Sequence, residues 1–222
     1  MNEPEPLPHA SPLFHPPPPP DAVIEVRPYG DADEAEWMRV HAIIMSTSHA
    51  WNYCIQERPQ YEGYESTRLV AVHDGRIVGL TDVQYDREPG EICFVKDSRG
   101  GYVLEFGRLP EYGRAGVGDK LMEATIADAK TKGVRRLEYW TQERRAQKFY
   151  IRRGMKEIGR HYRFRMKAPK EIEDHLMQDL VGVEYIYGVC VPEEWPLVKE
   201  KFEIRNDHPL EPHVCVGYEV RF

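Results

Sequence analysis

The chain has 222 residues, a hydrophobic content of 41% and a formal net charge of −7. This length allows one substantial core and is short for two full domains. The acidic balance gives no general attraction to nucleic acid or to anionic membranes. No apolar run approaches a transmembrane span, and the N-terminus lacks the basic and hydrophobic regions of a signal peptide. We therefore expect no membrane partner, and nucleic acid is a disfavoured partner.

The spacing of the cysteines indicates the redox state of the compartment in which the protein is expected. Cys54, Cys93, Cys190 and Cys215 are widely separated, with no C-x-x-C pair. This pattern favours buried free thiols in a reducing cytoplasm over disulfides or a metal site. The nine histidines show no metal-ligand spacing, and we expect His208 and His213 at the surface.

The first 22 residues hold half of the chain's 18 prolines and almost no material for a core. They predict a disordered or polyproline-II-like tail, and a passive leader is favoured over a docking segment. A short strand follows at residues 23–27. Asp33 and Glu36 then predict a capping box for a helix with a buried stripe of Trp37, Val40, His41 and Ile44.

Strands and one helix dominate the middle of the chain. A short helix and loop, broken at Pro59, are expected over residues 51–65. The strands 67–73 and 76–85 are joined by Asp74-Gly75, a strong hairpin signal. A strand at 102–109, a helix ending at Lys132 before Gly133, and a strand at 134–140 form a predicted βαβ crossover. Residues 162–166 add another strand.

The last quarter of the chain is less clearly patterned. Residues 169–180 predict a helix, and 181–191 can form a strand. Residues 213–222 alternate strictly, which predicts a strand that completes the sheet, either within the chain or by exchange in a homodimer. We expect three regions: a tail at 1–22, a domain at 23–167, and an extension at 168–222 packed on that domain.

The segment from Tyr102 to Leu121 carries the clearest chemical signal. It runs from a strand through a glycine-rich turn into a helix, and Gly113, Gly116 and Gly118 let an anion approach the main chain. The first helical turn offers free N–H groups and the positive end of the helix dipole. Asp119 stands where a P-loop needs lysine, and Leu121 where a dinucleotide motif needs glycine. A tight turn without a ligand is the alternative.

Two motifs in this chain resemble those of the GNAT N-acetyltransferase superfamily. Residues 113–118, GRAGVG, are similar to Q/R-x-x-G-x-G/A, although glycine holds the first position and arginine the second. Residues 143–155 are similar to the later pattern N-x-x-A-x-x-x-Y-x-x-x-G-F. There Ala146, Tyr150 and Gly154 match, whereas Glu143 replaces asparagine and Met155 replaces phenylalanine. We expect Glu143 to contact the cofactor weakly or not at all.

The resemblance implies a fold and a cofactor. The fold is mixed α/β (α+β), with a mostly antiparallel central sheet flanked by helices and splayed strands at the cofactor site. The implied co-substrate is acetyl-CoA, whose pantetheine arm pairs with exposed main chain as an added strand does. The implied cofactor-binding residues are Gly107, Arg108, Leu109, Arg114, Ala115, Gly116, Val117, Gly118, Asp119 and Tyr150.

Two residues are candidates for proton transfer during attack of an amine on the thioester. Glu105 lies in an apolar strand, where desolvation would favour it as a proton acceptor. Its alternative role is an ion pair with Arg68 or Arg76. Tyr150 matches the position that hydrogen-bonds the cofactor sulfur and can protonate the departing thiolate, because a phenol is a competent donor to a thiol-derived anion. Packing of the helix on the sheet is its alternative role, although Phe149 is available for that.

The acceptor is less well defined. Aromatic and acidic residues suit a cationic amine, and those in the region that lines the family's acceptor cleft are Trp51, Tyr53, Tyr61, Tyr64, Glu57, Glu62 and Glu65. A small polar amine, a polyamine, an aminoglycoside and a protein amine all remain open.

Residues 135–167 hold twelve Lys and Arg against three acids. A solvated helix face is the default interpretation; attraction of the cofactor phosphates is the functional one, and nucleic-acid binding is weaker.

Two functions are therefore consistent with the sequence. The first is an acetyl-CoA-dependent N-acetyltransferase that acts on a primary amine. The second is a non-catalytic acyl-CoA-binding or scaffold protein that keeps the fold, which the departures at Gly113 and Glu143 motivate.

Overall fold

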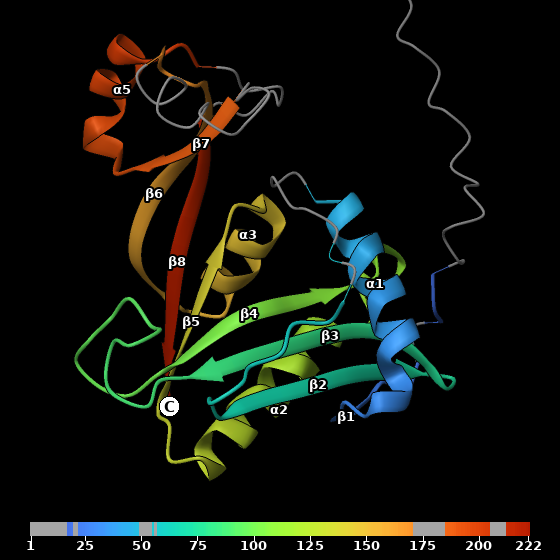
Figure 1. Cartoon of the computed structure of the whole chain (residues 1–222). Coiled ribbons are helices and arrows are strands. Elements are labelled where there is room, and N and C mark those ends of the chain that lie inside the picture. Colours follow the sequence, from blue (N-terminus) through green and yellow to red (C-terminus); the bar gives the residue numbers. More distant parts are fainter. Residues whose placement is uncertain (1–16, 20–21, 49–54, 56, 171–184, 205–211) are drawn as a thin grey trace, which may run out of the picture. The chain divides into compact units, whose positions relative to one another are not determined.

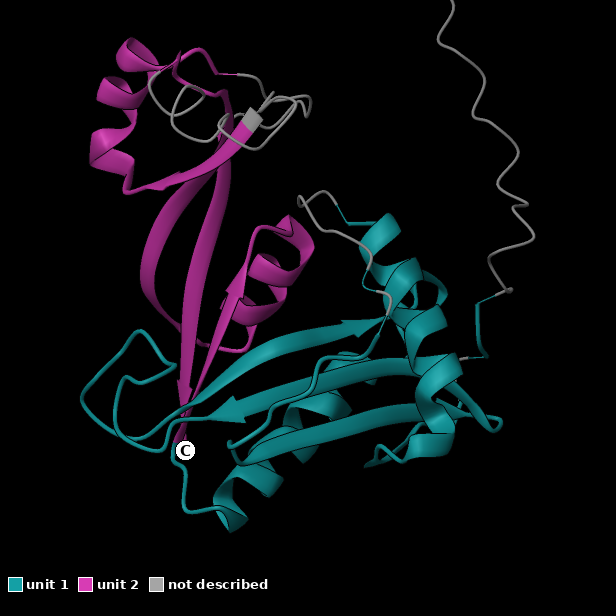
Figure 2. Cartoon of the chain, in the orientation of Figure 1, with its two compact units in different colours: residues 1–135 teal, residues 136–222 magenta. Residues whose placement is uncertain are grey.

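The computed structural model describes residues 17–19, 22–48, 55, 57–170, 185–204 and 212–222. The chain forms two compact units, residues 1–135 and 136–222, which Figure 2 shows in different colours. The predicted domain of residues 23–167 contributes to both units. Within the described residues, no helix is both long and apolar enough to cross a membrane.

The first unit contains a four-stranded antiparallel sheet in the order β1-β2-β3-β4 (Figure 1). Its strands are β1 (Glu25–Pro28), β2 (Ser66–His73), β3 (Arg76–Tyr85) and β4 (Gly101–Arg108). The predicted hairpin joins β2 to β3, and Asp74 and Gly75 have φ values of 47° and 75°. Both central residues thus take the left-handed conformation that a type I′ turn requires.

The pairing of β3 with β4 contains a bulge. Asp82 pairs with Glu105 and Val83 with Val103, so Leu104 is an extra residue on β4. A bulge bends its strand and redirects the side chains beside it. The bulge therefore lies next to Glu105, a predicted site residue.

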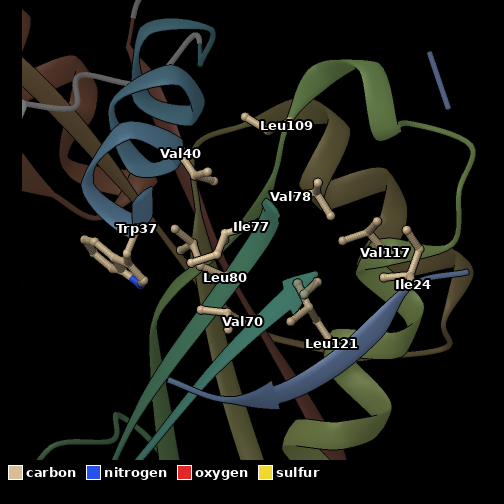
Figure 3. Packing of buried hydrophobic residues seen from close by; sticks show 11 residues of the cluster. Ile24, Trp37, Val40, Val70, Ile77, Val78, Leu80, Leu109, Val117 and Leu121 are labelled. Atoms are coloured by element: carbon tan, nitrogen blue, oxygen red, sulfur yellow. The ribbon is translucent and has the colours of Figure 1, made fainter. Parts of the chain in front are cut away.

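Helices cover both faces of this sheet. A β-carbon built on Gly107 of β4 would lie 2.9 Å from Ile44 of α1 (Glu34–Ser46), and one on Gly79 of β3 would lie 2.7 Å from Val117 of α2 (Val117–Thr131). Gly107 pairs with Leu80, and consecutive strand residues point to opposite faces. The two helices therefore pack on opposite faces. Figure 3 shows the core, whose labelled side chains are Ile24, Trp37, Val40, Val70, Ile77, Val78, Leu80, Leu109, Val117 and Leu121.

The predicted capping box at the start of α1 is wrong. A 3-10 turn at Asp31–Asp33 precedes the helix, and the Asp33 side chain makes no cap hydrogen bond. Its carboxylate instead accepts from Arg27 at 2.7 and 2.8 Å and from the Gly30 N–H at 2.9 Å. Glu36 pairs with Arg39. The predicted buried stripe is present, because Trp37, Val40 and His41 are buried.

The strands of the second unit pair antiparallel in the order β5-β8-β6-β7. Its elements are β5 (Arg136–Thr141), α3 (Arg144–Arg152), β6 (Lys156–Lys167), β7 (Tyr185–Cys190), a 3-10 turn at Pro192–Glu194, α5 (Trp195–Lys201) and β8 (His213–Arg221). The last strand thus lies between β5 and β6. Both of its edges are paired within the chain, so no exchange with a partner is needed to hold it, and the oligomeric state stays a prediction.

Burial along β8 differs from the half-buried strand that alternation predicts. Cys215 to Glu219 are all buried, so both faces are covered. His213 is 2% exposed, which contradicts its predicted surface position. Cys93, Cys190 and Cys215 are free and buried, as expected. Cys54, His208 and all but the first two residues of the predicted helix at 169–180 lie outside the described residues.

The structure has the predicted mixed α/β class, with antiparallel sheets flanked by helices. The predicted separation of the strands at 102–109 and 134–140 involves both units and stays a prediction. The short helix expected from residue 51 lies partly outside the described residues. The described chain from 57 to 65 is irregular.

Candidate functional site

The predicted phosphate-binding turn joins β4 to α2. A 3-10 turn at Pro110–Tyr112 begins directly after Leu109. The Arg108 guanidinium donates to the carbonyls of Leu109 (3.0 Å) and Pro110 (3.2 Å) and so braces the turn from within the chain. The Ala115 N–H donates to the Tyr112 carbonyl at 3.2 Å. Local hydrogen bonds thus fix the path from the strand into the helix.

Gly116 opens α2. It is the N-cap residue with φ 71° and ψ 10°, and as a glycine it has no side chain to cap the helix. A β-carbon at this position would find no atom within 4 Å. The first N–H groups of a helix lack acceptors within the helix and carry the positive end of its dipole. The start of α2 therefore presents amide donors to open space, with the exposed Arg114 beside it.

Glu105 faces α1 from the centre of β4. Its side chain is 16% exposed, and its Oε2 lies 3.3 Å from Nε2 of His41. The imidazole of His41 stacks on Trp37, with ring centroids 5.0 Å apart and planes at 10°. The polar partner that the structure gives Glu105 is thus a histidine on the helix, whereas the sequence alternative was an ion pair with Arg68 or Arg76.

A buried ion pair lies directly beside Glu105. Asp82 is its register partner on β3, and the Asp82 side chain is 0% exposed. The Arg58 guanidinium, from the segment after α1, donates to Oδ2 of Asp82, and the Tyr61 hydroxyl donates to the same oxygen at 3.0 Å. Within the described part of the chain, Oδ1 of Asp82 has no hydrogen-bond partner.

Aromatic rings surround Arg58. Its guanidinium carbon lies 4.4 Å from the ring centroid of Tyr29, 5.4 Å from that of Trp37 and 5.9 Å from that of Tyr61. Cations over aromatic faces are stabilised by the ring quadrupole, most strongly when they are desolvated. The Arg58 N–H also donates to Glu34 of α1 at 3.3 Å. These contacts attach the segment around residue 58 to the face of the sheet that carries Glu105.

Burial dominates the electrostatics of this cluster. Desolvation raises the pKa of Asp82 to about 6, against the opposing effect of Arg58, and Glu105 adds to the increase. Burial and the adjacent Asp82 raise the pKa of Tyr61 well above its usual range, so this phenol remains a hydrogen-bond donor. Asp82 can therefore exchange a proton near neutral pH.

Tyr150 lies in the second unit, on α3. It is 3% exposed, and its ring lies 4.9 Å from that of Tyr139 on β5 and 5.5 Å from that of Tyr218 on β8. Burial, and then Tyr218, raise the pKa of Tyr150 above its usual range. Its phenol therefore carries a proton at neutral pH. Tyr150 itself packs α3 on the sheet, whereas the neighbouring Phe149 is only partly buried.

Glu143 has a structural role at the start of α3. It is the N-cap residue, and its carboxylate accepts from the Arg145 N–H at 3.1 Å. Asparagine is a preferred N-cap residue, and the Glu143 carboxylate supplies the capping acceptor in its place. Gly154, with φ 70°, ends the same helix.

A family model matches the part of the chain that contains the segments described above. The model described as the Acetyltransferase (GNAT) family matches residues 35–155. The chain belongs to the GNAT acetyltransferase family. Acetyl-CoA is the co-substrate that membership of this family implies. No curated protein gives a significant match to the chain.

Solved structures with the GNAT fold resemble the chain at low sequence identity. A GCN5-related N-acetyltransferase from Kribbella flavida has 17% identity and a TM-score of 0.54, with 92% of this chain and 100% of that one covered. Arabidopsis thaliana NAA60 in complex with a bisubstrate analogue has 16% identity and a TM-score of 0.50, with 63% and 87% covered. A tandem GNAT protein from the clavulanic acid biosynthesis pathway has 15% identity and a TM-score of 0.52. This chain spans about half of it, because 65% of this chain and 48% of that one are covered.

The predicted site residues fall into two groups. Glu105, the main chain of 107–109 and the GNAT turn at 113–119 are parts of the first unit, and Tyr150 is part of the second. Of the predicted acceptor residues, Tyr61 joins the Asp82 cluster, Tyr64 contacts Glu91 at 3.1 Å, and Glu65 pairs with Arg99. Trp51 and Tyr53 lie outside the described residues, and Glu57 and Glu62 are exposed.

Sequence reasoning missed Asp82 and Arg58. One signal for Asp82 was available, because a carboxylate interrupts the apolar run VGLTDV of a central strand. Arg58 offers no such signal, since only the folded chain brings it to Asp82. Arg136, expected on a solvated basic face, is instead 1% exposed and pairs with the buried Glu138 and Glu219.

The residues at the start of α2 fit the diphosphate of CoA. Gly116 is left-handed, has no side chain that could occupy the helix start, and has open space at its β-carbon. Asp119 is the acidic residue in the first turn of α2. The positive end of the helix dipole stabilises a negative charge at this position.

Proposed function

We propose that this protein is an acetyl-CoA-dependent N-acetyltransferase that transfers an acetyl group to a primary amine by direct attack on the thioester. The observation that carries this proposal is the turn between β4 and α2. Gly116 there takes a left-handed conformation and, as a glycine, places no side chain at the helix N-terminus, in the segment that the GNAT family model matches. Membership of the family supplies the reaction class, and the turn supplies a binding mode.

Named residues would hold the cofactor. The amides of Gly116, Val117 and Gly118 would bind the diphosphate, together with the flanking Arg114, Ala115 and Asp119. The main chain of Gly107, Arg108 and Leu109 would pair with the pantetheine arm. When bound, acetyl-CoA supplies an activated acyl group as a thioester.

The chain's own residues would move the protons. Glu105 accepts a proton from the acceptor ammonium, which frees the nitrogen lone pair. That lone pair forms the new C–N bond as the C–S bond breaks. The electron pair of the C–S bond leaves with the sulfur, and the attacking nitrogen releases its second proton to solvent. Tyr150, protonated at neutral pH because its pKa is raised, donates to the thiolate. General acid–base catalysis by such groups contributes about 10²–10⁴-fold to a rate.

A binding and a turnover experiment test this function. Acetyl-CoA and CoA should raise the melting temperature of the full chain in a concentration-dependent way, because a ligand that binds only the native state stabilises it. Release of free thiol from acetyl-CoA, screened over small polar amines, polyamines, aminoglycosides and peptide amines, should identify an acceptor. The absence of any thermal shift at millimolar acetyl-CoA would contradict the proposal.

A second function is favoured by two departures from the family motif. Gly113 holds the position of the usual glutamine or arginine, and the Glu143 side chain is engaged in capping α3. A non-catalytic acyl-CoA-binding protein would show the thermal shift without turnover of any amine in the panel. Robust thiol release with one acceptor excludes it. For either function we expect a cytoplasmic protein, with a small-molecule or protein amine as the partner of the enzyme.

A further inference from the structure

Two carboxylates face each other across strands in the interior of the first unit. Asp82 on β3 and Glu105 on β4 are direct register partners, and both lie on the α1 face. Like charges directly opposite on paired strands destabilise a sheet. Asp82 also lies in a fully buried position. Two neighbouring carboxylates in the interior lower the stability of the fold unless a positive charge compensates for them, and a function at this place would explain why both are present.

The structure compensates only one of the two charges. Arg58 and Tyr61 both donate to Oδ2 of Asp82, and the other buried oxygen, Oδ1, has no hydrogen-bond partner within the described residues. Inside the unit, two carboxylates and the Arg58 guanidinium leave one negative charge when His41 is neutral. Arg68, the register partner of Asp82 on β2, is exposed and forms no ion pair with either carboxylate within the described residues. That residual charge suits an ammonium group.

We propose that Asp82 is a positioning residue for Glu105. Arg58 and Tyr61 hold the Asp82 carboxylate in place by hydrogen bonds. Together these residues make the site bind its acceptor as a cationic amine and keep Glu105 ready to accept the ammonium proton. This proposal rests on the acetyltransferase function proposed above. Asp82 acts through its neighbour: its carboxylate lies directly across the strand pair from Glu105, and the charge of Glu105 contributes to the raised pKa of Asp82, so the two groups interact. The proton moves from the ammonium nitrogen to a Glu105 oxygen, with no other reactant.

The proposal has a defined pH dependence. The charged and titratable groups that face Asp82 are Arg58 and Tyr61 from the segment after α1, Arg68 opposite on β2 and Glu105 opposite on β4, with His41 of α1 beyond Glu105. Because burial raises the pKa of Asp82 to about 6, this residue is ionised above pH 6 and neutral below it. Its effect on Glu105 is therefore lost as the pH falls through about 6.

The first measurement needs no acceptor. In the full chain labelled with ¹³C at the aspartate side-chain carboxyl, one aspartate should titrate near pH 6, whereas ordinary aspartates titrate near 4. That signal should be absent from Asp82→Asn and present in Asp86→Asn. Asp86 is a matched control, because it is equally buried directly after the end of β3, but its carboxylate accepts hydrogen bonds from the main-chain N–H groups of Ile92 and Cys93.

The coupling to Glu105 is tested in the same way. Because the Glu105 charge raises the pKa of Asp82, Glu105→Gln should move the Asp82 midpoint to lower pH. An unchanged midpoint would overturn the proposal, whether or not any amine is turned over. Failure of the acetyltransferase function and failure of this inference are therefore distinguishable. The wild-type and Glu105→Gln titrations also decide the matter if Asp82→Asn does not fold.

Kinetics with the best amine of the panel complete the test. Asp82→Asn should lower kcat at least 10-fold, abolish the limb near pH 6 in the profile of kcat/KM, and leave the KM for acetyl-CoA within twofold. Arg58→Lys, which keeps the positive charge, should retain more activity than Arg58→Met. A pH profile of Asp82→Asn that superimposes on the wild-type profile would contradict the positioning role.

Discussion

Tyr150 is enclosed by Tyr139, Tyr218 and Phe149, a setting that serves packing as well as catalysis. The two roles differ in what the hydroxyl group contributes. Removing it leaves the ring contacts in place, so a packing residue loses little when it becomes phenylalanine. A proton donor loses its function.

We therefore expect Tyr150→Phe to lower kcat by about 100-fold, with a melting temperature within a few degrees of wild type. The raised pKa of Tyr150 keeps the phenol protonated across the assay range, so the loss should be the same from pH 6 to 9. Thiol release measured over this range checks it. Tyr218→Phe, from the same cluster, is the control and should keep most of the activity; equal rates for both variants and wild type would remove Tyr150 from the reaction.

Some site residues can be predicted from their spacing within one short segment, and others cannot. Gly116 and Tyr150 stand at fixed intervals within short segments, and the sequence predicts their positions in a turn and on a helix. Asp82 and Arg58 are 24 residues apart and meet buried only because β3 and the segment after α1 lie together. A pair of this kind has no periodicity or local motif, so sequence reasoning has nothing to detect.

At the level of elements, small residues determine how closely the helices approach the sheet. A β-carbon on Gly79 would lie 2.7 Å from the Val117 side chain and 3.0 Å from the Gly107 carbonyl oxygen. The second neighbour is main chain and cannot move cheaply. Gly79 therefore lets the first turn of α2 pack against β3, which places the uncapped helix start beside the end of β4.

Gly79→Ala should lower the free energy of unfolding by about 1–3 kcal/mol, the usual cost of overpacking a well-filled core. Chemical denaturation of the full chain measures it. Gly30→Ala is the control: its nearest neighbour would be 3.9 Å away, and its effect should stay within about 0.5 kcal/mol, as for most surface substitutions. Equal effects of the two substitutions would show that helix α2 is not held against the sheet at Gly79.

The elements also show where sequence patterns were overridden. Asp33 has the right spacing for a capping box, but its carboxylate forms an ion pair with Arg27 of β1 instead. The strand at 213–222 was predicted by alternation, yet it pairs along both edges with β5 and β6, and both of its faces are buried from Cys215 to Glu219. Local propensity gives the type of an element, and its tertiary neighbours determine which groups it pairs with and how deeply it is buried.

For the whole molecule, the class of fold followed from the order of the elements and from two short motifs, and the family model agrees with it. The division into units at residue 135 did not follow, because it depends on which strands pair over long sequence separations. The identity of the acceptor amine could not be predicted from the sequence either, for a related reason. On the proposal made here it depends on clusters such as Asp82 with Arg58, which only the folded chain brings together.

Binding of acetyl-CoA to glycine variants tests the role of the α2 N-terminus most directly. Gly116 and Gly133 flank the same helix, with φ values of 71° and 70° and no atom within 4 Å of a built β-carbon. Alanine should cost each site about 1–2 kcal/mol of stability through the left-handed backbone. Only the methyl group at Gly116 would stand where the diphosphate meets the amides.

Calorimetric titration should therefore show affinity reduced at least 10-fold in Gly116→Ala and unchanged in Gly133→Ala, although both variants melt at similarly lowered temperatures. Equal affinities of wild type and both variants for acetyl-CoA would contradict phosphate binding at this turn.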